Sequence, residues 1–394
     1  MYFSPTISFT ALWLIGACAL CVLAVAAFYF FRVRTVVNYR RRADGERPDK
    51  PDSDYLPASV IIYSQGDAEN LHELLEVVLN QDYPAAYEVI VVNEGEASDV
   101  RDTVGMLRNR YPNLYLTFTP EGVVNLSRKK LALTLGIKAA RYDVAVLTTT
   151  AATVTSPLWL RRMTWRFDKN SPAEVVLGFA AVDPGEDSVH GCRRRAFDFV
   201  AESVRWLSVA IAGKPFRGTE YNIAYRRSLF LKNKGFARSL NLHYGDDDIF
   251  ISEIANRHNT QVELSEDSIV LLREGNHPRL FNERVLRRIF TERFIRRKPR
   301  VLVPLTGILQ IAAIACGAAA AVIDWPNLQV AVIAAVLIVA MLAFDIATWR
   351  KAMKALKSRP LCITIPWFVL THPLRRGMAR LHARLGKQKK YTWD

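Results

Sequence analysis

Residues 59–95 read SVIIYSQGDAENLHELLEVVLNQDYPAAYEVIVVNEG, and their pattern predicts the fold class. It opens with a β-branched run at 59–62 and closes with another at 89–92, and both have the composition of buried strands. Between them, apolar residues recur at the spacing of one helical face. These residues are Leu71, Leu74, Leu75, Val78 and Leu79. Strand, helix and strand in this order predict a βαβ unit with parallel strands.

The alternation of strand and helix continues as far as residue 150. Two further strands are predicted at 114–120 and 143–150, and two further helices at 98–112 and 125–140. We therefore expect an α/β domain whose sheet is mostly parallel and carries helices on both faces. Ligands of such folds bind beyond the carboxyl ends of the strands, so a site is expected in the loops that follow them.

Three apolar stretches are long enough to cross a membrane, which takes about 20 residues. They are residues 8–31, 301–323 and 328–348. The first is too long for the apolar core of a signal peptide, and no small-residue cleavage site follows it. Only the short turn DWPN separates the other two. One N-terminal span and a C-terminal helical hairpin are therefore expected.

Basic residues beside the spans predict the orientation, because such flanks stay on the cytoplasmic side. They are Arg32, Arg34, Arg40, Arg41, Arg42, Arg296, Arg297, Lys298, Arg300, Arg350, Lys351, Lys354 and Lys357, and the 324–327 turn has none. The N-terminus is expected outside, with residues 32–300 and the C-terminal tail in the cytoplasm. The predicted location is the inner (cytoplasmic) membrane of a bacterial-type cell.

The net charge of +15 and the pI near 9.7 favour anionic membrane lipids as partners over nucleic acid, because much of the excess charge lies beside the spans. The tail at 366–394 begins with Trp367, Phe368 and Leu370 and continues with many basic residues. This pattern is typical of a helix at the membrane interface, and a solvated basic tail is the alternative.

Residues 44–57, DGERPDKPDSDYLP, are polar and proline-rich and are predicted to form a linker. The predicted division is a span at 1–31, a basic juxtamembrane segment with the linker at 32–57, a soluble domain at 58–300, the hairpin at 301–348 and a basic amphipathic tail at 349–394. The five cysteines show neither a pairing pattern nor metal-ligand spacing, so no disulfide or zinc site is predicted.

Four stretches in order carry a resemblance to a known family. They are residues 59–95, RKKLALTLGIKAARYDVAVLTTTAATVTSPLWL at 128–160, GTEYNIAYRRSLF at 218–230 and GDDDIFI at 245–251. Together they resemble the landmarks of membrane-bound family 2 glycosyltransferases with the GT-A fold, over roughly residues 58–300. The resemblance implies a Rossmann-like, mostly parallel GT-A domain in the cytoplasm, flanked by the three spans. It also implies inverting sugar transfer from a nucleotide sugar.

The resemblance implies a nucleotide pocket at the ends of the first two strands. Its residues are Ser64, Gln65 and Asp67 after the first strand and Glu94 after the second, where family members usually have aspartate. Lys129 and Lys130 are candidates for a phosphate contact, and a solvated helix face is the alternative for both.

Three adjacent carboxylates, Asp246, Asp247 and Asp248, occupy the position of the catalytic base in the resemblance, which assigns that role to Asp246. Adjacent carboxylates repel one another, so at least one of them is expected to bind a proton or a cation more tightly. The alternative is a capped helix start, since aspartate is favoured at an N-cap and in the first turn.

Two further elements of the resemblance concern the acceptor and the diphosphate. Gly218 and Asn222 fit the acceptor-side segment, whereas Glu220 stands where many relatives have glycine. Arg284, Arg287 and Arg288 lie where relatives place an element that holds the diphosphate, but its tryptophan is missing. Their spacing places them on one helical face, and guanidinium groups suit phosphate oxygens. A basic helix lying on anionic lipid is the alternative.

The metal loop of the family lacks its carboxylates in this chain. In VLTTTAATVTSPLWL at 146–160, Thr150 and Ala152 stand at the two aspartate positions that hold Mg²⁺ or Mn²⁺ in typical relatives. A threonine hydroxyl and an alanine methyl do not replace two carboxylates for a hard cation. No metal is expected at this loop, although Thr150 remains a candidate contact to the nucleotide sugar.

Two functions follow from this pattern. The first is a membrane-bound inverting transferase that moves a sugar to a lipid-linked or polysaccharide acceptor without the usual metal, with arginines and Lys129 neutralising the leaving group. The second is a catalytically inactive relative that serves as a scaffold or partner subunit of a membrane glycan-assembly system. The departures at Glu94, Thr150, Ala152 and Glu220 keep this second function open.

Overall fold

The computed structural model describes residues 7–46, 50–120, 122, 126–169, 171–182, 191–273, 277–295, 305–325 and 327–385. The chain forms two compact units. The helical unit comprises Met1–Asn38, His190–Ser208 and Arg300–Leu381, and the sheet unit comprises Tyr39–Val189, Val209–Pro299 and His382–Asp394. The helical unit thus takes in residues 190–208, which lie inside the soluble domain predicted at 58–300.

The sheet unit contains a seven-stranded sheet in the order β3-β2-β1-β4-β8-β6-β9 and a three-stranded sheet in the order β5-β10-β7. The strands are β1 Ala58–Ser64, β2 Tyr87–Asn93, β3 Leu114–Phe118, β4 Val144–Thr149, β5 Ala152–Thr153, β6 Val175–Leu177, β7 Ala180–Val182, β8 Ile223–Arg226, β9 Thr260–Val262 and β10 Val270–Leu272. Strands β1 to β4 pair in parallel, and β8 runs antiparallel to β4 and β6. The predicted mostly parallel α/β sheet is confirmed.

Helices connect these strands. They are α3 Ala68–Val78, α4 Ser98–Arg108, α5 Arg128–Ala139, α6 Trp159–Thr164, α8 Arg227–Lys232, α9 Ile249–Ile254 and α10 Pro278–Thr291. Helix α3 buries the predicted apolar face, including Leu71 and Leu75. Helix α5 packs closely on the sheet at Gly136, where a Cβ atom would lie 2.7 Å from Val92 and 2.8 Å from Ile61. This close approach lets α5 lie directly on β1 and β2.

The carboxyl ends of β1, β2 and β4 meet at one edge of the large sheet. Ser64 of β1 pairs with Asn93 of β2, and Tyr63 pairs with Thr149 of β4. Because the three strands are parallel, the loops that follow them emerge at this same edge. The predicted location of the site is therefore consistent with the observed register.

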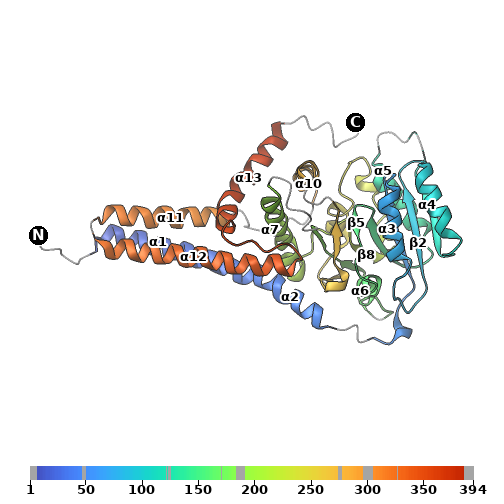
Figure 1. The fold of residues 1–394 in the computed structure, drawn as a ribbon, viewed down its shortest axis with the longest axis horizontal. Coiled ribbons are helices and arrows are strands. Elements are labelled where there is room, and N and C mark those ends of the chain that lie inside the picture. Colours follow the sequence, from blue (N-terminus) through green and yellow to red (C-terminus); the bar gives the residue numbers. More distant parts are fainter. Residues whose placement is uncertain are drawn as a thin grey trace, which may run out of the picture. The chain divides into compact units, whose positions relative to one another are not determined.

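The helical unit contains α1 Phe9–Phe28, α11 Leu305–Ile323 and α12 Leu328–Ala355, which run side by side (Figure 1). Helix α1 continues through a π-helical turn, Tyr29–Val33, into α2, Arg34–Gly45, and the unit also holds most of α7, Cys192–Ile211, and of α13, Ile365–Leu385. All three predicted spans coincide with helices that are long and apolar enough to cross a membrane. The Ser8 amide donates to Asp324 Oδ1 (3.2 Å), so α1 begins beside the turn between α11 and α12.

Polar side chains join the three long helices inside the bundle. Gln310 Nε2 donates to the fully buried Asp345 (2.6 Å), and Trp349 Nε1 donates to the Tyr29 hydroxyl (3.0 Å). Tyr29 lies where α1 enters its π-helical turn. Buried polar contacts of this kind hold apolar helices in one register, because the alternative is an unsatisfied polar group in hydrocarbon.

Candidate active site

A tight turn before α9 places the three aspartates. Gly245 has a φ of 110°, and a Cβ atom on it would lie 2.4 Å from Ile249 Cδ1. Only glycine fits this conformation without strain. The turn therefore directs Asp246, Asp247 and Asp248 from consecutive positions towards different partners.

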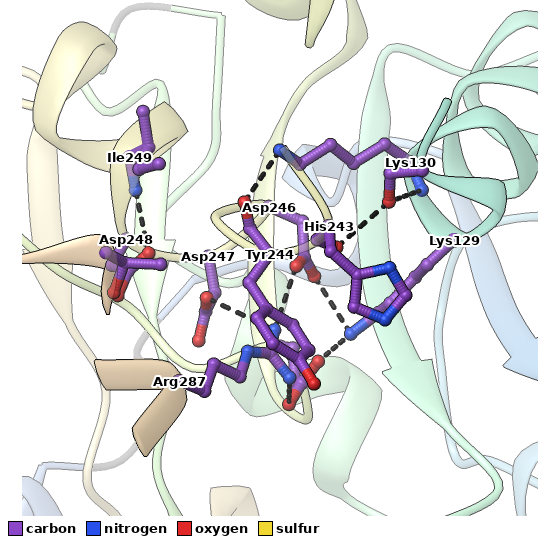
Figure 2. Close-up of polar contacts among 12 residues, drawn as sticks. Lys129, Lys130, His243, Tyr244, Asp246, Asp247, Asp248, Ile249 and Arg287 are labelled. Carbon is purple, nitrogen blue, oxygen red and sulfur yellow. Dashed lines mark hydrogen bonds and ion pairs between the residues drawn. The ribbon is translucent and has the colours of Figure 1, made fainter. Parts of the chain in front are cut away.

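Asp246 belongs to a closed ring of ion pairs. Its carboxylate lies 2.9 Å from Lys129 Nζ and 2.9 Å from Arg287 NH2. Glu220 pairs with the same two cations, contacting Lys129 and lying 2.6 Å from Arg287 NH1. Figure 2 shows Lys129 and Arg287 reaching Asp246 from α5 and α10. We call Lys129, Glu220, Asp246 and Arg287 the charge ring; it brings together residues from four separate segments.

Asp246 and Asp247 have opposite pKa shifts. Burial opposes ionisation of Asp246, but the ammonium of Lys129 and the guanidinium of Arg287 outweigh it and hold its pKa well below the usual range. Burial and the neighbouring Asp248 carboxylate raise the pKa of Asp247 to about 6. The Asp247 side chain is 18% exposed, against 3% for Asp246. Asp247 is thus the carboxylate that takes up a proton more readily and is more accessible.

Asp248 has a structural role. It is the N-cap of α9, where its Oδ1 accepts from the Ile249 amide (3.0 Å). Its other oxygen accepts from Arg217 NH2 (3.1 Å) and from the Thr291 hydroxyl (2.5 Å). The capped helix start considered from the sequence is therefore found at Asp248, which also ties α10 to the aspartate loop.

The predicted nucleotide residues Gln65 and Glu94 lie together with Lys129 around Tyr63. The Tyr63 hydroxyl donates to Glu94 Oε2, and Gln65 Nε2 donates to the same oxygen (3.3 Å). Lys129 Nζ lies 5.5 Å from the centre of the Tyr63 ring. The sequence pattern treats Tyr63 only as a strand residue, so its place between the nucleotide side and the charge ring was not predicted.

Two other predicted nucleotide residues, Ser64 and Asp67, make contacts within the loops that follow β1 and β2. Asp67 is the N-cap of α3 and accepts from the Asn70 amide (3.1 Å). The Ser64 side chain is fully buried, and its carbonyl accepts from the Glu94 amide (2.9 Å). Both residues hold the ends of β1 and β2 in place.

Gly218 and Asn222, which flank Glu220 in the acceptor-side segment, are both held in place by hydrogen bonds. The Gly218 amide donates to the Asp247 carbonyl (3.0 Å), and a Cβ atom there would lie 2.8 Å from Ile223. Asn222 is fully buried: it accepts from Trp159 Nε1 (3.1 Å) and donates to the carbonyls of Phe179 and Ser268. The Asn222 side chain therefore joins the segments that precede β7, β8 and β10.

The three candidate arginines lie on α10 but differ in their contacts. Arg287 enters the charge ring, and its guanidinium lies 4.8 Å from the centre of the Tyr244 ring. The Tyr244 hydroxyl donates to Glu283 of α10 (2.9 Å). Arg284 Nε donates to the Leu280 carbonyl (3.4 Å), and Arg288 lies on the same helix. Helix α10 is thus fastened to the aspartate loop at several points.

The loop at the metal position offers no carboxylate. Thr150 is buried and its amide donates to the Tyr63 carbonyl (3.1 Å), while Ala152 lies buried in β5 opposite Leu272. Across the described part of the chain, histidine, cysteine and acidic residues form no group of three suited to a metal ion. The residues present do not fit a divalent cation here. Instead, the Lys129 ammonium lies between the carboxylates of Glu220 and Asp246.

Lys130 differs from the solvated helix face considered for it. Its side chain is fully buried and points towards the loop before the aspartates (Figure 2). The only signal for Lys130 in the sequence is its place beside Lys129 near the start of a helix. At that position the sequence does not distinguish a buried lysine from an exposed one.

Comparisons with known proteins add to this geometry. The model of glycosyl transferase family 21 matches residues 18–387. The mannosyltransferase PcManGT from Pyrobaculum calidifontis, solved with GDP-Man and Mn²⁺, is 18% identical with a TM-score of 0.50, covering 94% of this chain and 99% of that chain. S. aureus TarS 1–349 is 14% identical (TM-score 0.39; 84% and 92% covered). Glucosyl-3-phosphoglycerate synthase from Mycobacterium tuberculosis is also 14% identical (TM-score 0.38; 58% and 78% covered). No curated protein matches the chain.

Proposed function

Because the chain belongs to glycosyl transferase family 21, we propose that it is an inverting, membrane-bound transferase that moves a sugar from a nucleotide sugar to a lipid-linked or polysaccharide acceptor. The observation that carries this proposal is the charge ring. Two cations and an adjacent carboxylate with a raised pKa lie beside the strand ends where ligands of parallel α/β folds bind. Perturbed carboxylates in such a position are candidates for acid–base chemistry.

The donor is proposed to lie between Glu94 and the charge ring. Both described contacts to the Glu94 carboxylate use Oε2, so Oε1 is the oxygen that we assign to an N–H of the nucleotide base. Lys129 and Arg287 would exchange carboxylate oxygens for the oxygens of the diphosphate, which a guanidinium binds bidentately. These two cations neutralise the charge that grows on the leaving group.

Asp247 is proposed as the general base, in place of Asp246, which the family resemblance suggested. The two ion pairs of Asp246 lower its affinity for a proton, whereas the raised pKa of Asp247 suits proton transfer near neutral pH. The acceptor oxygen bonds to the anomeric carbon while the bond from that carbon to the donor phosphate oxygen breaks. The acceptor proton passes to Asp247, and the electron pair leaves with the nucleoside diphosphate.

The proposed reaction uses no metal at positions 150 and 152. The Lys129 ammonium takes the charge-neutralising role, because it already lies between two carboxylates beside Tyr63. We place this site in the cytoplasm of a bacterial-type cell, with the N-terminus outside, from the basic residues that flank the spans. Of these residues, Arg296, Arg297, Lys298 and Arg300 lie outside the described part of the chain.

One observation favours a second candidate, an inactive scaffold or partner subunit of a glycan-assembly system. The cations of the charge ring are already paired with carboxylates of the same chain. Such a ring is a stable arrangement without any substrate. In this function the ring holds α5 and α10 together, and removing a cation alters stability without altering any nucleotide affinity.

Calorimetry on the full-length chain in lipid nanodiscs separates the two functions. UDP sugars and GDP sugars are titrated in EDTA and again with Mn²⁺. We expect one of them to bind equally well in both, and Lys129→Met to weaken that binding by about tenfold or more, as loss of a charge-assisted contact predicts. The control is Lys138→Met, an exposed position on the same helix. If no nucleotide sugar binds at millimolar concentration, the transferase proposal fails and the scaffold is supported.

A further inference from the structure

Lys130 is a fully buried lysine whose ammonium lies in a cage of oxygen atoms. It donates to the Ser239 carbonyl (2.5 Å), the Ser239 hydroxyl (3.1 Å), the Leu242 carbonyl (3.1 Å) and the Tyr244 carbonyl (2.8 Å). Three of these four acceptors are backbone carbonyls of one short loop. Lys130 therefore binds mainly the backbone of this loop and pairs with no acidic side chain there.

That loop, Ser239–Tyr244, leads directly into Gly245 and the aspartates. The start of α5 holds it at two more points through Ser127, whose amide donates to the Leu240 carbonyl (2.9 Å) and whose hydroxyl donates to the His243 carbonyl (3.1 Å). Five consecutive or near-consecutive carbonyls are thus held by the first turn of one helix. Lys130 supplies the only charged donor among these contacts.

The charge on Lys130 is expensive to bury. Burial lowers its pKa to about 8, while Asp246, Asp248 and Asp247 favour the charged form and Arg287 opposes it. An apolar side chain of similar size would fill the same space without this cost. The charged donor contacts several carbonyls at once and holds them more strongly than a neutral donor would.

Adjacent lysines of α5 thus act on the same loop in two ways. Lys129 binds the Asp246 carboxylate, while Lys130 binds the backbone two to seven residues before Asp246, at Ser239, Leu242 and Tyr244. Successive helical residues point about 100° apart, so one turn of α5 sets both the side chain and the backbone. The Lys129 contact with Asp246 and the Lys130 contacts with the loop backbone together determine where Asp247 lies relative to Arg287.

We propose that Lys130 is a positioning residue, whose ammonium fixes the Ser239–Tyr244 loop so that Asp246 and Asp247 face the cations of the charge ring. This inference rests on the proposed function for the role of those carboxylates, but the contact with the loop does not. Loss of the ammonium removes its hydrogen bonds to the Ser239, Leu242 and Tyr244 carbonyls, and the loop then shifts to find other donors. A shift of about 1 Å at a reacting group lowers turnover by about 100-fold.

The test compares Lys130→Met, which keeps the volume and removes the charge, with Lys138→Met on the exposed end of α5. Amide hydrogen exchange of the full-length chain in nanodiscs reports on the loop without requiring activity. We expect faster exchange in residues 240–248 of Lys130→Met, unchanged exchange in α3, and no change in Lys138→Met. Unchanged exchange in residues 240–248 overturns the proposal.

Turnover then links the loop to the chemistry. We expect Lys130→Met to lower kcat by about 100-fold with little change in KM, since the donor contacts remain. Lys130→Ala leaves a space for a small cation, and methylammonium is expected to restore both loop protection and part of kcat; this variant also serves if Lys130→Met does not fold. Absence of rescue in folded Lys130→Ala overturns the proposal. Loss of loop protection in a chain whose wild type transfers no sugar supports the positioning and contradicts the proposed function.

Discussion

Asp246, Asp247 and Asp248 show how three identical side chains acquire different properties from their partners. Asp248 is the N-cap of α9 and accepts hydrogen bonds from an arginine and a threonine. Asp246 forms ion pairs with two cations. Asp247 lies 3.6 Å from Arg287, and its side chain is the most exposed of the three. Carboxylates whose environments move their pKa values apart are suited to different roles. The sequence predicted this cluster but not the division of roles, because adjacent aspartates look equivalent until their partners are known.

Replacing Asp247 tests its role as the base. The base must be ionised, so the transfer rate is expected to rise with pH through about 6 and then level off. Asp247→Asn removes the proton acceptor and is expected to lower kcat by about 100-fold or more, with donor affinity retained. The measurement is the pH dependence of kcat for the wild type and the variant. An Asp247→Asn chain with the wild-type rate contradicts the assignment.

The same carboxylates predict opposite effects on stability at pH 7.5. The pKa of Asp247 is raised from its ordinary value of 3.8 to about 6 in the folded chain. The stability that this group contributes is therefore present below pH 3.8 and is lost as the pH rises through about 6, so ionised Asp247 destabilises the fold at pH 7.5. The pKa of Asp246 is lowered from its ordinary value of 3.8. The stability that this group contributes is present above pH 3.8 and is lost on acidification, so ionised Asp246 stabilises the fold at pH 7.5. Asp247→Asn is expected to stabilise the chain, by at most about 3 kcal/mol at about 1.4 kcal/mol per pKa unit, and Asp246→Asn to destabilise it.

Thermal unfolding of the two variants in the same detergent checks this prediction. At pH 7.5 the midpoint should rise for Asp247→Asn and fall for Asp246→Asn. At pH 4.5 the gain from Asp247→Asn should shrink, because the wild-type carboxyl is then largely protonated. Shifts in the same direction at pH 7.5 would show that the charge ring does not govern these groups.

Helix α13 has an apolar stripe on one face. Trp367, Leu374, Met378 and Leu381 are each more than half exposed, and their spacing of seven, four and three residues places them on one side of the helix. The side away from the stripe is held to α7. There Asp198 accepts from His372 Nδ1 (3.0 Å) and from Arg375 NH2 (2.5 Å). These contacts with α7 prevent α13 from rotating about its axis, so the stripe stays exposed.

This stripe is predicted to lie in the membrane interface, because it combines apolar residues with flanking arginines and adjoins the spans in the same unit. A fluorophore on Leu374→Cys, in a chain whose native cysteines are replaced, should be quenched by brominated lipids in nanodiscs. The matched control is Glu69→Cys on the exposed side of α3, where quenching should be absent. Equal quenching at the two positions would mean that α13 is solvated or covered by protein.

Elements with long periodic patterns were predictable, and short ones were not. The strands β1 to β4 and helices α3 to α5 follow directly from apolar spacing, since each buries a continuous face. The second sheet consists of strands of two or three residues, β5, β7 and β10. Segments this short carry no periodicity, and their pairing depends on contacts distant in sequence, as between Ala152 and Leu272.

For the molecule as a whole, the resemblance to membrane-bound GT-A glycosyltransferases is confirmed by the family 21 match and by the fold shared with the mannosyltransferase. The three spans coincide with helices suited to a membrane. Of the residues that the sequence singled out, the structure brings Lys129, Asp246 and Arg287 together in ion pairs. Glu220 was noted as a departure from the family, and only the structure places it in the charge ring.

The orientation of the spans gives a prediction for the intact cell. Cys362 is exposed and follows α12, so it should be cytoplasmic and protected from a membrane-impermeant maleimide. Trp325→Cys, in the exposed turn between α11 and α12, should react with the same reagent from outside. Permeabilised cells, in which both positions should react, are the control. Reaction of Cys362 in intact cells would reverse the proposed orientation.

We propose that Lys129 and Arg287 supply the charge that a metal supplies in typical relatives. The most direct measurement is the rate of nucleoside diphosphate release from UDP and GDP sugars by the full-length chain in nanodiscs, with acceptor lipid extract, in EDTA and in Mn²⁺. We predict rates that agree within about twofold in the two conditions and that fall by about 100-fold in Lys129→Met. Release that requires Mn²⁺ and disappears in EDTA would contradict the claim.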